Sequence, residues 1–457
     1  MAGLGSILNT AFKSLEASTM GLSVASNNIA NAATPGYSKQ RVIFAEAPNI
    51  GDKFLSGSGV SVVKIEGLRE QLIDGRLQQE ISAKAGFEQL ADTLGEIEIL
   101  FNDGGDTGML PEITDFFNSF HTLAMDPVST NFREEVRIKA DNLAQAFQIR
   151  GGALRQLRLT ADSGIKNDVA HINTLTSQIG GISTQIIKSE AGGQVANDLR
   201  DMRGELVREV SEFLDVLELE SSSSYQLHAV GGLMLVLNGT TVPLTANSSS
   251  STGFTEIGIG TADVTSSLKS GRLHARVDVR DKFIPDYLSK LDELAYDITQ
   301  QVNQIHSASY DASGNTGVDF FTTLGSSADA ARLIGLSPTV ASDVSTVAAS
   351  AGAGGTDNQA ATAIGNLLHA SGTKGSPVDQ YRQLVFKLGN DVQTTQGETS
   401  EHAALLTQLQ NRRDSFAGVS VDEESMQILQ FQRSYQASAR MIQVIDNLLE
   451  TLIALGR

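Results

Sequence analysis

Small and apolar side chains recur in alternating steps of four and three residues through the first thirty positions of the chain. This spacing keeps them on one seam of a helix, as in a coiled coil. The same spacing returns at the other end, after a helix-start signal at 420–424. We predict that the two terminal helices pair as a coiled coil. The larger seam residues are Leu4, Leu8, Leu15, Leu22, Ile29, Ile428, Phe431, Tyr435, Ile442, Ile445, Leu449 and Leu452.

A turn is predicted directly after the first helix. The residue before a proline disfavours the helical conformation, and Pro35–Gly36 suits the two central positions of a type II turn. We therefore expect a bend from Thr34 to Tyr37. Two interpretations of the amides before it stay open: they bond to neighbouring backbone where packing excludes water, or they only cap the helix end. These amides are Asn27, Asn28 and Asn31.

The middle of the chain predicts a mainly α, elongated, multidomain rod with a smaller β subdomain. Helical spacing extends over 131–159 and again over 165–219, with an interruption at Gly192–Gly193. At about 1.5 Å of rise per residue, such helices are tens of ångströms long. The predicted units are an N-terminal coiled-coil arm with an extended linker (1–60), a long-helix bundle (61–224), the β subdomain (225–280), a bundle helix (281–310), a loop-rich insertion with little core of its own (311–365), a second bundle helix (366–416) and a C-terminal coiled-coil arm (417–457).

Charge and composition exclude several classes of partner. The chain has 53 acidic and 34 basic residues, a formal net charge of -19, which argues against nucleic acid or an anionic membrane as partner. It has no cysteine, so disulfides, thiolate zinc sites and cysteine catalysis are excluded. We also predict neither a membrane-spanning helix nor a cleavable signal, because no apolar window is long enough and no basic segment precedes an apolar one.

Candidate chemistry is sparse. The seven histidines are scattered, without an HExxH motif or partners at metal-ligand spacing. Asp311 to Asn315 imitates the start of a calcium loop, but Thr316 and Thr322 stand where the loop needs glycine and a bidentate glutamate. We therefore predict no catalytic residue, no metal site and no cofactor, and we do not expect an enzyme.

The terminal seams pose the main physical question. Each fully buried Leu or Ile contributes roughly 1.5–3 kcal/mol, so two seams left in water would forgo on the order of ten kcal/mol. Two interpretations stay open. The termini pack on each other inside the monomer, or they pair and are completed only by neighbouring copies, which would make the protein an assembly subunit.

Several motifs resemble those of bacterial flagellar proteins. The stretches 26–31 and 34–37 resemble the N-terminal signature of flagellar rod, hook and hook-associated proteins. Other stretches narrow the resemblance to the family of flagellar hook-associated protein 1, the hook–filament junction proteins. The resemblance covers nearly the whole chain and is weakest over 326–373. The narrowing stretches are 115–120 with 126–127, 291–295 with 302–306, 314–321, 419–424 and 432–440.

The resemblance implies a structural subunit of the flagellum that forms a junction ring between hook and filament and serves as an adaptor for filament assembly. It implies that the terminal helices lie in an inner tube while the middle domains face outward. The implied partners are other copies of the chain, the hook protein, the second junction protein and an export chaperone at the C-terminal helix. It also implies an extracellular location, reached through the flagellar type III export apparatus.

Alternatives stay open at this point. Another flagellar axial protein, such as a hook, distal rod or second junction protein, shares the terminal signature, although the 302–306 helix and the glycine-rich loop after it argue against this. A secreted adhesin or effector with a trimerising terminal coiled coil is a different class. An enzyme is the third, and no constellation of residues supports it.

Overall fold

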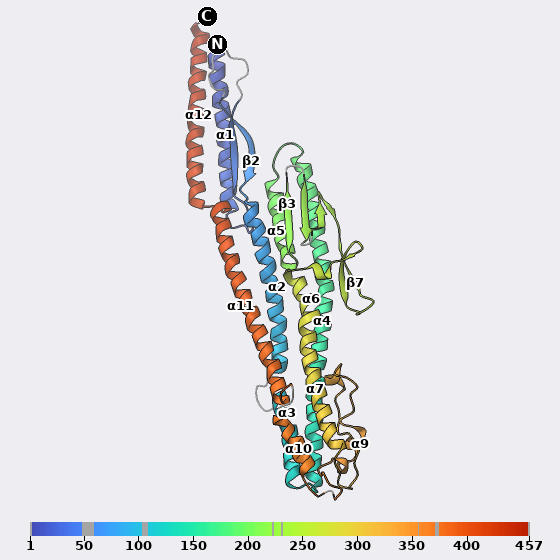
Figure 1. The fold of residues 1–457 in the computed structure, drawn as a ribbon. Helices are drawn as coiled ribbons and strands as arrows, with labels where there is room; N and C mark the ends of the chain where they lie inside the picture. The colour runs from blue at the N-terminus through green and yellow to red at the C-terminus, as the bar shows by residue number, and fades with distance from the viewer. Residues whose placement is uncertain are drawn as a thin grey trace.

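The computed structural model describes residues 2–47, 59–102, 108–221, 224–229, 232–354, 356–370 and 374–455. Long helices lie roughly side by side in an elongated molecule, and both ends of the chain lie together at one end of it (Figure 1). Most elements are helices, a smaller part is β-sheet, and the two terminal helices pack along each other. The predicted fold class is confirmed.

The arm at the top of Figure 1 combines both ends of the chain. Helix α1 (Ala2–Ala30) packs along α12 (Val421–Leu455). Strands β1 (Gln40–Glu46) and β2 (Val60–Gly67) form an antiparallel hairpin that lies against α1. We call α1, this hairpin and α12 the arm. Because β2 pairs with β1, we include residues up to Gly67 in the N-terminal part of the arm, seven residues beyond the predicted boundary at residue 60.

The predicted bend after α1 is present. The backbone N–H of Tyr37 donates to the carbonyl oxygen of Thr34 at 3.2 Å, and Gly36 has a φ of 77°. A positive φ at this position is the mark of a type II turn and favours glycine. A Cβ on residue 36 would also meet the carboxylate of Glu205, which would have to move aside.

The body below the arm is a bundle of long helices. Its main members are α2 (Gln71–Phe101), α3 (Met109–Met125), α4 (Thr130–Glu190), α7 (Ile284–Ser307) and α11 (Pro377–Ala417). Helices α2 and α11 pack along each other below the arm (Figure 1).

One expectation for the body is wrong. The predicted break between the helices 131–159 and 165–219 does not exist, because α4 continues unbroken through this region. Leu154, Ala161 and Ile165 are all buried along it. Polar residues and Gly164 interrupt the apolar pattern there without stopping the helix. The predicted break at Gly192–Gly193 is confirmed, since α4 ends at Glu190 and Gly193 has a φ of 83°.

The β subdomain is displaced from its predicted position. Its strands occupy 216–263, and helical structure resumes at Gly271, so the range 225–280 is wrong at both ends. The sequence pattern does not predict the first strand, because two of its inward positions, 218 and 220, are glutamates. Both glutamates pair with the buried Arg203, so the strand lacks the usual alternation of apolar and polar residues. The elements are α5 (Asn197–Phe213), β3 (Val216–Glu220), β4 (Tyr225–Ala229), β5 (Leu233–Leu237), β6 (Thr240–Thr241), β7 (Leu244–Ser248), β8 (Thr255–Ile259), β9 (Ala262–Asp263) and α6 (Gly271–Asp278), with β3-β4-β5-β6 in one sheet and β7-β8-β9 in another.

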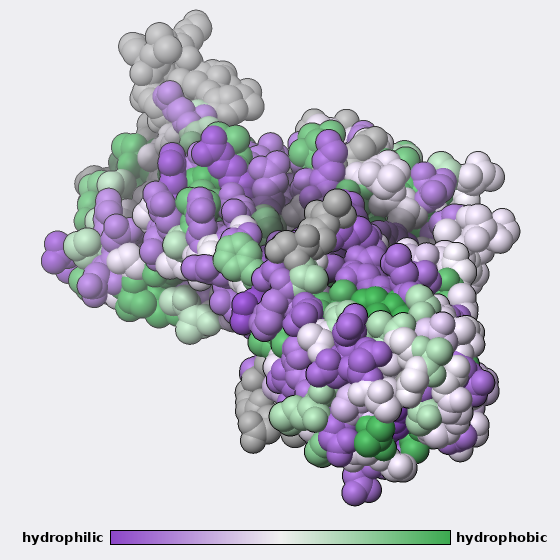
Figure 2. Space-filling model, turned by 60° about the horizontal axis from the view of Figure 1, so that its bottom comes forward, coloured by the Kyte–Doolittle hydropathy of each residue, from purple (hydrophilic) through white to green (hydrophobic). Residues whose placement is uncertain are grey.

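Two hydrophobic cores hold the body together. One lies between α4, α5 and the strands. The other fills the end of the body far from the arm and includes a cluster of five phenylalanine rings, all 0% exposed, in which neighbouring ring centroids lie 4.9–5.9 Å apart. On the surface near this end, hydrophobic residues form separate patches among polar ones (Figure 2). The five rings are Phe116, Phe117, Phe120, Phe320 and Phe321.

The predicted insertion adds its side chains to this second core. It carries the short helices α8 (Ala330–Leu333), α9 (Pro338–Ser342) and α10 (Gln359–Asn366). His306, at the end of α7, anchors it from inside, since its Nδ1 lies 2.7 Å from the carbonyl oxygen of Val318 and its Nε2 accepts the N–H of Ala348 at 2.8 Å.

Candidate assembly surface and arm–body joint

Small residues let the two arm helices approach closely. Ala11, Ser18, Gly21 and Ala25 of α1 are all buried. A Cβ on Gly21 would lie 2.4 Å from the ring of Phe431, so the ring occupies the space that glycine leaves. A seam of small residues therefore allows a large side chain of α12 to pack directly on the α1 backbone.

The predicted seam residues differ widely in burial. Ile445 is 3% exposed, whereas Tyr435 is 44% and Leu452 is 50% exposed. A pair of helices covers only one side of each partner, so burial is incomplete for most of the seam. Nine residues are half-buried: Leu4, Leu8, Leu15, Leu22, Ile29, Ile428, Phe431, Ile442 and Leu449.

A second apolar stripe on α12 is exposed in the part of the chain that the structure describes. Met441, Val444 and Leu448 follow one another at steps of three and four, the seam residue Leu452 lies four residues further on, and all four are exposed. Residues at these steps share one side of a helix. The arm therefore presents more apolar surface than its own two helices can bury, which is typical of a surface that contacts another molecule.

Asn28 connects three parts of the arm. Its Oδ1 accepts the backbone N–H of Gln40 at 2.9 Å and the hydroxyl of Tyr37 at 2.8 Å. Its Nδ2 donates to the carbonyl oxygen of Gln40 and to Oε2 of Glu424, both at 2.9 Å. Asn28 is 1% exposed, so each of these polar groups depends on its protein partner.

The other two predicted amides, Asn27 and Asn31, bond only to residues close to them in the chain. The Nδ2 of Asn31 donates to the carbonyl oxygen of Asn27 at 3.0 Å, and its Oδ1 accepts the hydroxyl of Thr34 at 3.3 Å. The Nδ2 of Asn27 lies 3.4 Å from the Tyr37 hydroxyl. Asn28 thus bonds neighbouring backbone, whereas Asn31 caps the end of α1, so each interpretation describes a different residue.

Lys39 and two glutamates tie the hairpin to the start of α12. The Lys39 Nζ lies 3.0 Å from both Oε2 of Glu423 and Oε1 of Glu424, and Glu424 is completely buried. Burial opposes the charged form of Lys39, but the hydrogen bonds to the two carboxylates outweigh it and raise the pKa of Lys39. The ammonium group therefore stays charged beside the buried carboxylate.

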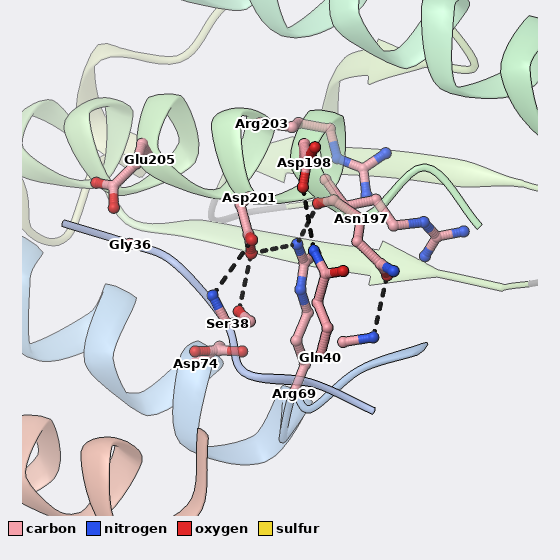
Figure 3. A network of polar contacts seen from close by, with 12 residues as sticks. Gly36, Ser38, Gln40, Arg69, Asp74, Asn197, Asp198, Asp201, Arg203 and Glu205 are labelled. Carbon is pink, nitrogen blue, oxygen red and sulfur yellow. Dashed lines mark hydrogen bonds and ion pairs between the residues drawn. The ribbon is translucent and has the colours of Figure 1, made fainter. Parts of the chain in front are cut away.

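The base of the hairpin meets the first turn of α5 in a network of polar contacts (Figure 3). Asp201 accepts the backbone N–H of Ser38 at 3.2 Å, the Ser38 hydroxyl at 2.8 Å and a guanidinium N–H of Arg69 at 2.6 Å. Asp198 accepts the side-chain amide of Gln40 at 3.1 Å. We call these contacts between arm and body the joint.

Asn197 adds a second pair of contacts to the joint. Its Oδ1 accepts the backbone N–H of Gly67 at 3.0 Å, and its Nδ2 donates to the carbonyl oxygen of Ile65 at 3.1 Å. Burial, followed by the charges of Asp198, Asp201 and Glu424, raises the pKa of nearby Tyr37 to about 12. The Tyr37 hydroxyl therefore stays protonated and can donate a hydrogen bond to Oδ1 of Asn28.

Little in the sequence pattern indicates the joint. Ser38 precedes β1, Arg69 lies between β2 and α2, and Asp201 lies in α5, so the three are far apart in the chain. The turn at Pro35–Gly36 signals that a junction follows, but no spacing rule identifies partners more than 130 residues away.

The described residues hold neither a cluster of metal ligands nor a membrane-spanning helix. Within those ranges, no three His, Asp or Glu side chains gather as metal ligands would. No helix among the same residues is both long and apolar enough to span a membrane. The features that the described residues do provide are a pair of terminal helices, an exposed apolar stripe on α12 and a polar joint between arm and body.

Comparison with protein families agrees with this architecture. The model for the flagellar hook-associated protein FlgK helical domain matches residues 94–321, about half of the chain. This range runs from the end of α2 through α7 and the phenylalanine pair of the insertion. The chain belongs to the FlgK family. A second model, for the C-terminal part of flagellar basal body rod FlgEFG proteins, matches 412–455, which covers α12.

Members of the FlgK family from other bacteria match almost end to end. The chain is 27% identical to flagellar hook-associated protein 1 of Bacillus subtilis (strain 168), over 98% of this chain and 97% of that protein. It is 23% identical to the protein of the same name from Escherichia coli (strain K12), over 98% of this chain and all of the relative. The flagellar hook junction protein FlgK of Burkholderia pseudomallei shares the fold, with a TM-score of 0.66 at 15% identity, over 76% of this chain and 100% of that one.

Proposed function

We propose that this protein is a structural subunit of the bacterial flagellum, forming a junction ring between hook and filament that serves as an adaptor for filament assembly. The observation that carries the proposal is the uncovered apolar stripe of α12 in a member of the FlgK family. One chain cannot bury the stripe, whereas a ring of copies can. The relatives, a flagellar hook-associated protein 1 and a flagellar hook junction protein, support a position at the hook.

The proposed task is mechanical. The arms of neighbouring copies pack on one another through the seam and the exposed stripe and form an inner tube. The bodies, held together by their own cores, face outward. The seam residues predicted from the sequence, with Asn28 fixing the end of α1, are the residues that we assign to this packing.

The proposed partners follow from this position in the flagellum. The ring contacts the hook protein below it and the second junction protein above it. Before assembly the chain is exported through the flagellar type III apparatus, and an export chaperone covers the apolar face of α12. An amphipathic helix with two apolar stripes suits binding in a groove of such a chaperone.

Deletion of the gene tests the junction role. We expect cells to build complete hooks without filaments and to release unpolymerised filament protein into the medium. A plasmid copy of the gene should restore filaments. Normal filaments in the deletion strain would refute the proposal.

The chaperone assignment has a separate test. A chain that lacks residues 420–457 should lose binding to the export chaperone, because α12 carries both apolar stripes. A chain with the exposed Ile149 of α4 changed to Ala is the control and should bind normally. Undiminished binding by the truncated chain would refute the assignment.

The alternatives predict different assemblies. A secreted adhesin with a trimerising coiled coil would form fixed trimers in solution, whereas a junction subunit adds to the ends of isolated hooks. Electron microscopy of hooks mixed with purified protein separates the two. We expect added density at one end of each hook and no stable trimers in dilute solution.

A further inference from the structure

The first turns of α11 carry an exposed aromatic side chain beside a groove. Phe386 is 78% exposed, the largest exposed fraction of any large hydrophobic residue that the structure describes. An open groove of about 1000 Å³ lies between this part of α11 and α7, and Phe386 is one of its lining residues. A ring left in water next to a groove is typical of a surface that contacts another molecule.

Arg382 gives this groove a cation without a partner. Three lysines line the same groove, Lys290, Lys374 and Lys387, and each forms an ion pair with an acidic residue of α7 or α11. Arg382 is exposed and forms no ion pair with any residue that the structure describes. It precedes Phe386 by one helical turn, so both side chains lie on one side of α11. We call Arg382, Phe386 and the groove the groove surface.

The end of α2 presents a surface of the complementary kind. Ile99 is 75% exposed, and the exposed Asp92 and Glu96 precede it at steps of four and three. These three residues lie on the side of α2 opposite the buried Leu94 and Phe101. Within the described part of the chain, neither carboxylate has a cationic partner. We call Asp92, Glu96 and Ile99 the acidic surface.

The two surfaces lie at about the same level along the body. The hydroxyl of Tyr381 donates to the carbonyl oxygen of Phe101 at 3.3 Å, and α2 and α11 pack along each other. Tyr381 directly precedes Arg382, and Phe101 is two residues beyond Ile99. Copies that stand side by side in a ring therefore bring the groove surface of one copy to the level of the acidic surface of another.

We infer that the groove surface of one copy binds the acidic surface of a neighbouring copy. The inference rests on the proposed ring and names the parts of the body that meet in it. Ile99 enters the groove beside Phe386, and Arg382 faces the carboxylates of Asp92 and Glu96. Each chain has a net charge of -19, so copies repel one another unless opposite charges meet at the contact. Because the two surfaces differ, the contact repeats from copy to copy and can close into a ring.

Crosslinking on isolated hooks tests this contact. The chain has no cysteine, so Gln383→Cys and Asn102→Cys each introduce a single thiol. Both positions are exposed, and the side chains of the two surfaces stay in place. Hooks capped with an equal mixture of the two variants and treated with a short bismaleimide linker should give linked dimers on a denaturing gel. Either variant alone should give single chains, because equal surfaces do not meet.

Charge reversal sharpens the test. Arg382→Glu in the Gln383→Cys chain should lower the linked fraction about tenfold, because like charges then face each other. Glu96→Arg in the Asn102→Cys chain should restore linking to that variant. The matched control is Arg76→Glu in the Gln383→Cys chain, an exposed reversal near the other end of α2 that should link normally. Unchanged linking by the Arg382→Glu chain would contradict the charge pairing.

The outcomes separate this contact from the junction role. Added density at hook ends without linked dimers from the mixture would overturn the contact and leave the junction role in place. Linked dimers from one variant alone would show that equal surfaces meet, and would also overturn it. If the parent protein adds no density to hook ends, the junction role fails, and this contact fails with it.

Discussion

The arm and the far end of the body bury their apolar residues in different ways. In the body, five phenylalanine rings from α3 and the insertion are completely enclosed. In the arm, Ile445 is buried, but most of the seam is half-buried and a second stripe is open. The body therefore buries its apolar residues within the single chain, whereas the arm leaves apolar surface that only other molecules can cover.

The difference explains how one chain can fold alone and still assemble. A closed core stabilises the body in the monomer, because its apolar surface is already removed from water. The open arm keeps apolar surface that becomes buried only against other molecules. Stability and assembly are thus divided between the two ends of the molecule, and the following predictions test that division.

The largest effect is expected in the body core. Phe116 contacts four other phenylalanine rings, so Phe116→Ala should leave a cavity and lower the free energy of unfolding by about 3–5 kcal/mol. Urea unfolding followed by circular dichroism measures the loss. A change below about 1 kcal/mol would contradict the description of this core as closed.

Acid should weaken the same core through His306. Burial lowers the pKa of His306 to about 4, so its neutral form contributes stability that is complete above the ordinary pKa of 6.5. That contribution is lost as the pH falls from 6.5 through about 4, and it amounts to on the order of 3 kcal/mol. The control is His306→Gln, whose unfolding free energy should fall less over this range. Parallel pH profiles for the two proteins would contradict the prediction.

A smaller effect is expected inside the arm. Asn28→Ala removes the hydrogen-bond partner of the Gln40 backbone N–H and carbonyl groups and of Oε2 of Glu424, at a cost of about 1–3 kcal/mol. Amide hydrogen exchange at Gln40 should become faster, while exchange in the body stays unchanged. The matched control is Asn31→Ala, which removes only a cap and should leave Gln40 protected.

The smallest effect on the monomer is expected on the open stripe. Leu448→Ala should change the free energy of unfolding by no more than about 0.5 kcal/mol, because the side chain is 49% exposed. Incorporation at hook ends should nevertheless fall, since the side chain is needed only between copies. Ile149→Ala, an exposed change on α4, should alter neither measurement. Normal incorporation of the Leu448→Ala variant at hook ends would show that assembly does not need this stripe.

Periodicity in the sequence determined the terminal helices, the turn between α1 and the hairpin, and the elongated helical architecture. These features depend on neighbours three or four residues away, or on the local preferences of Pro35–Gly36. Periodicity did not predict strand β3, because Glu218 and Glu220 occupy inward positions where the pattern requires apolar residues. The continuity of α4 was missed because a polar run can lie within a long helix.

Only the tertiary structure decided which contacts are shared across the chain. The sequence placed Asn28 near a helix end, but the fold brought Gln40 and Glu424 to its amide. It likewise brought Asp201 to Ser38 and Arg69, from positions more than 130 residues away. A single hydrogen-bond acceptor has no period along the chain, so its partners are set by how whole elements pack. The sequence thus predicted the seam of the arm, and the packing of α5 against the hairpin created its joint.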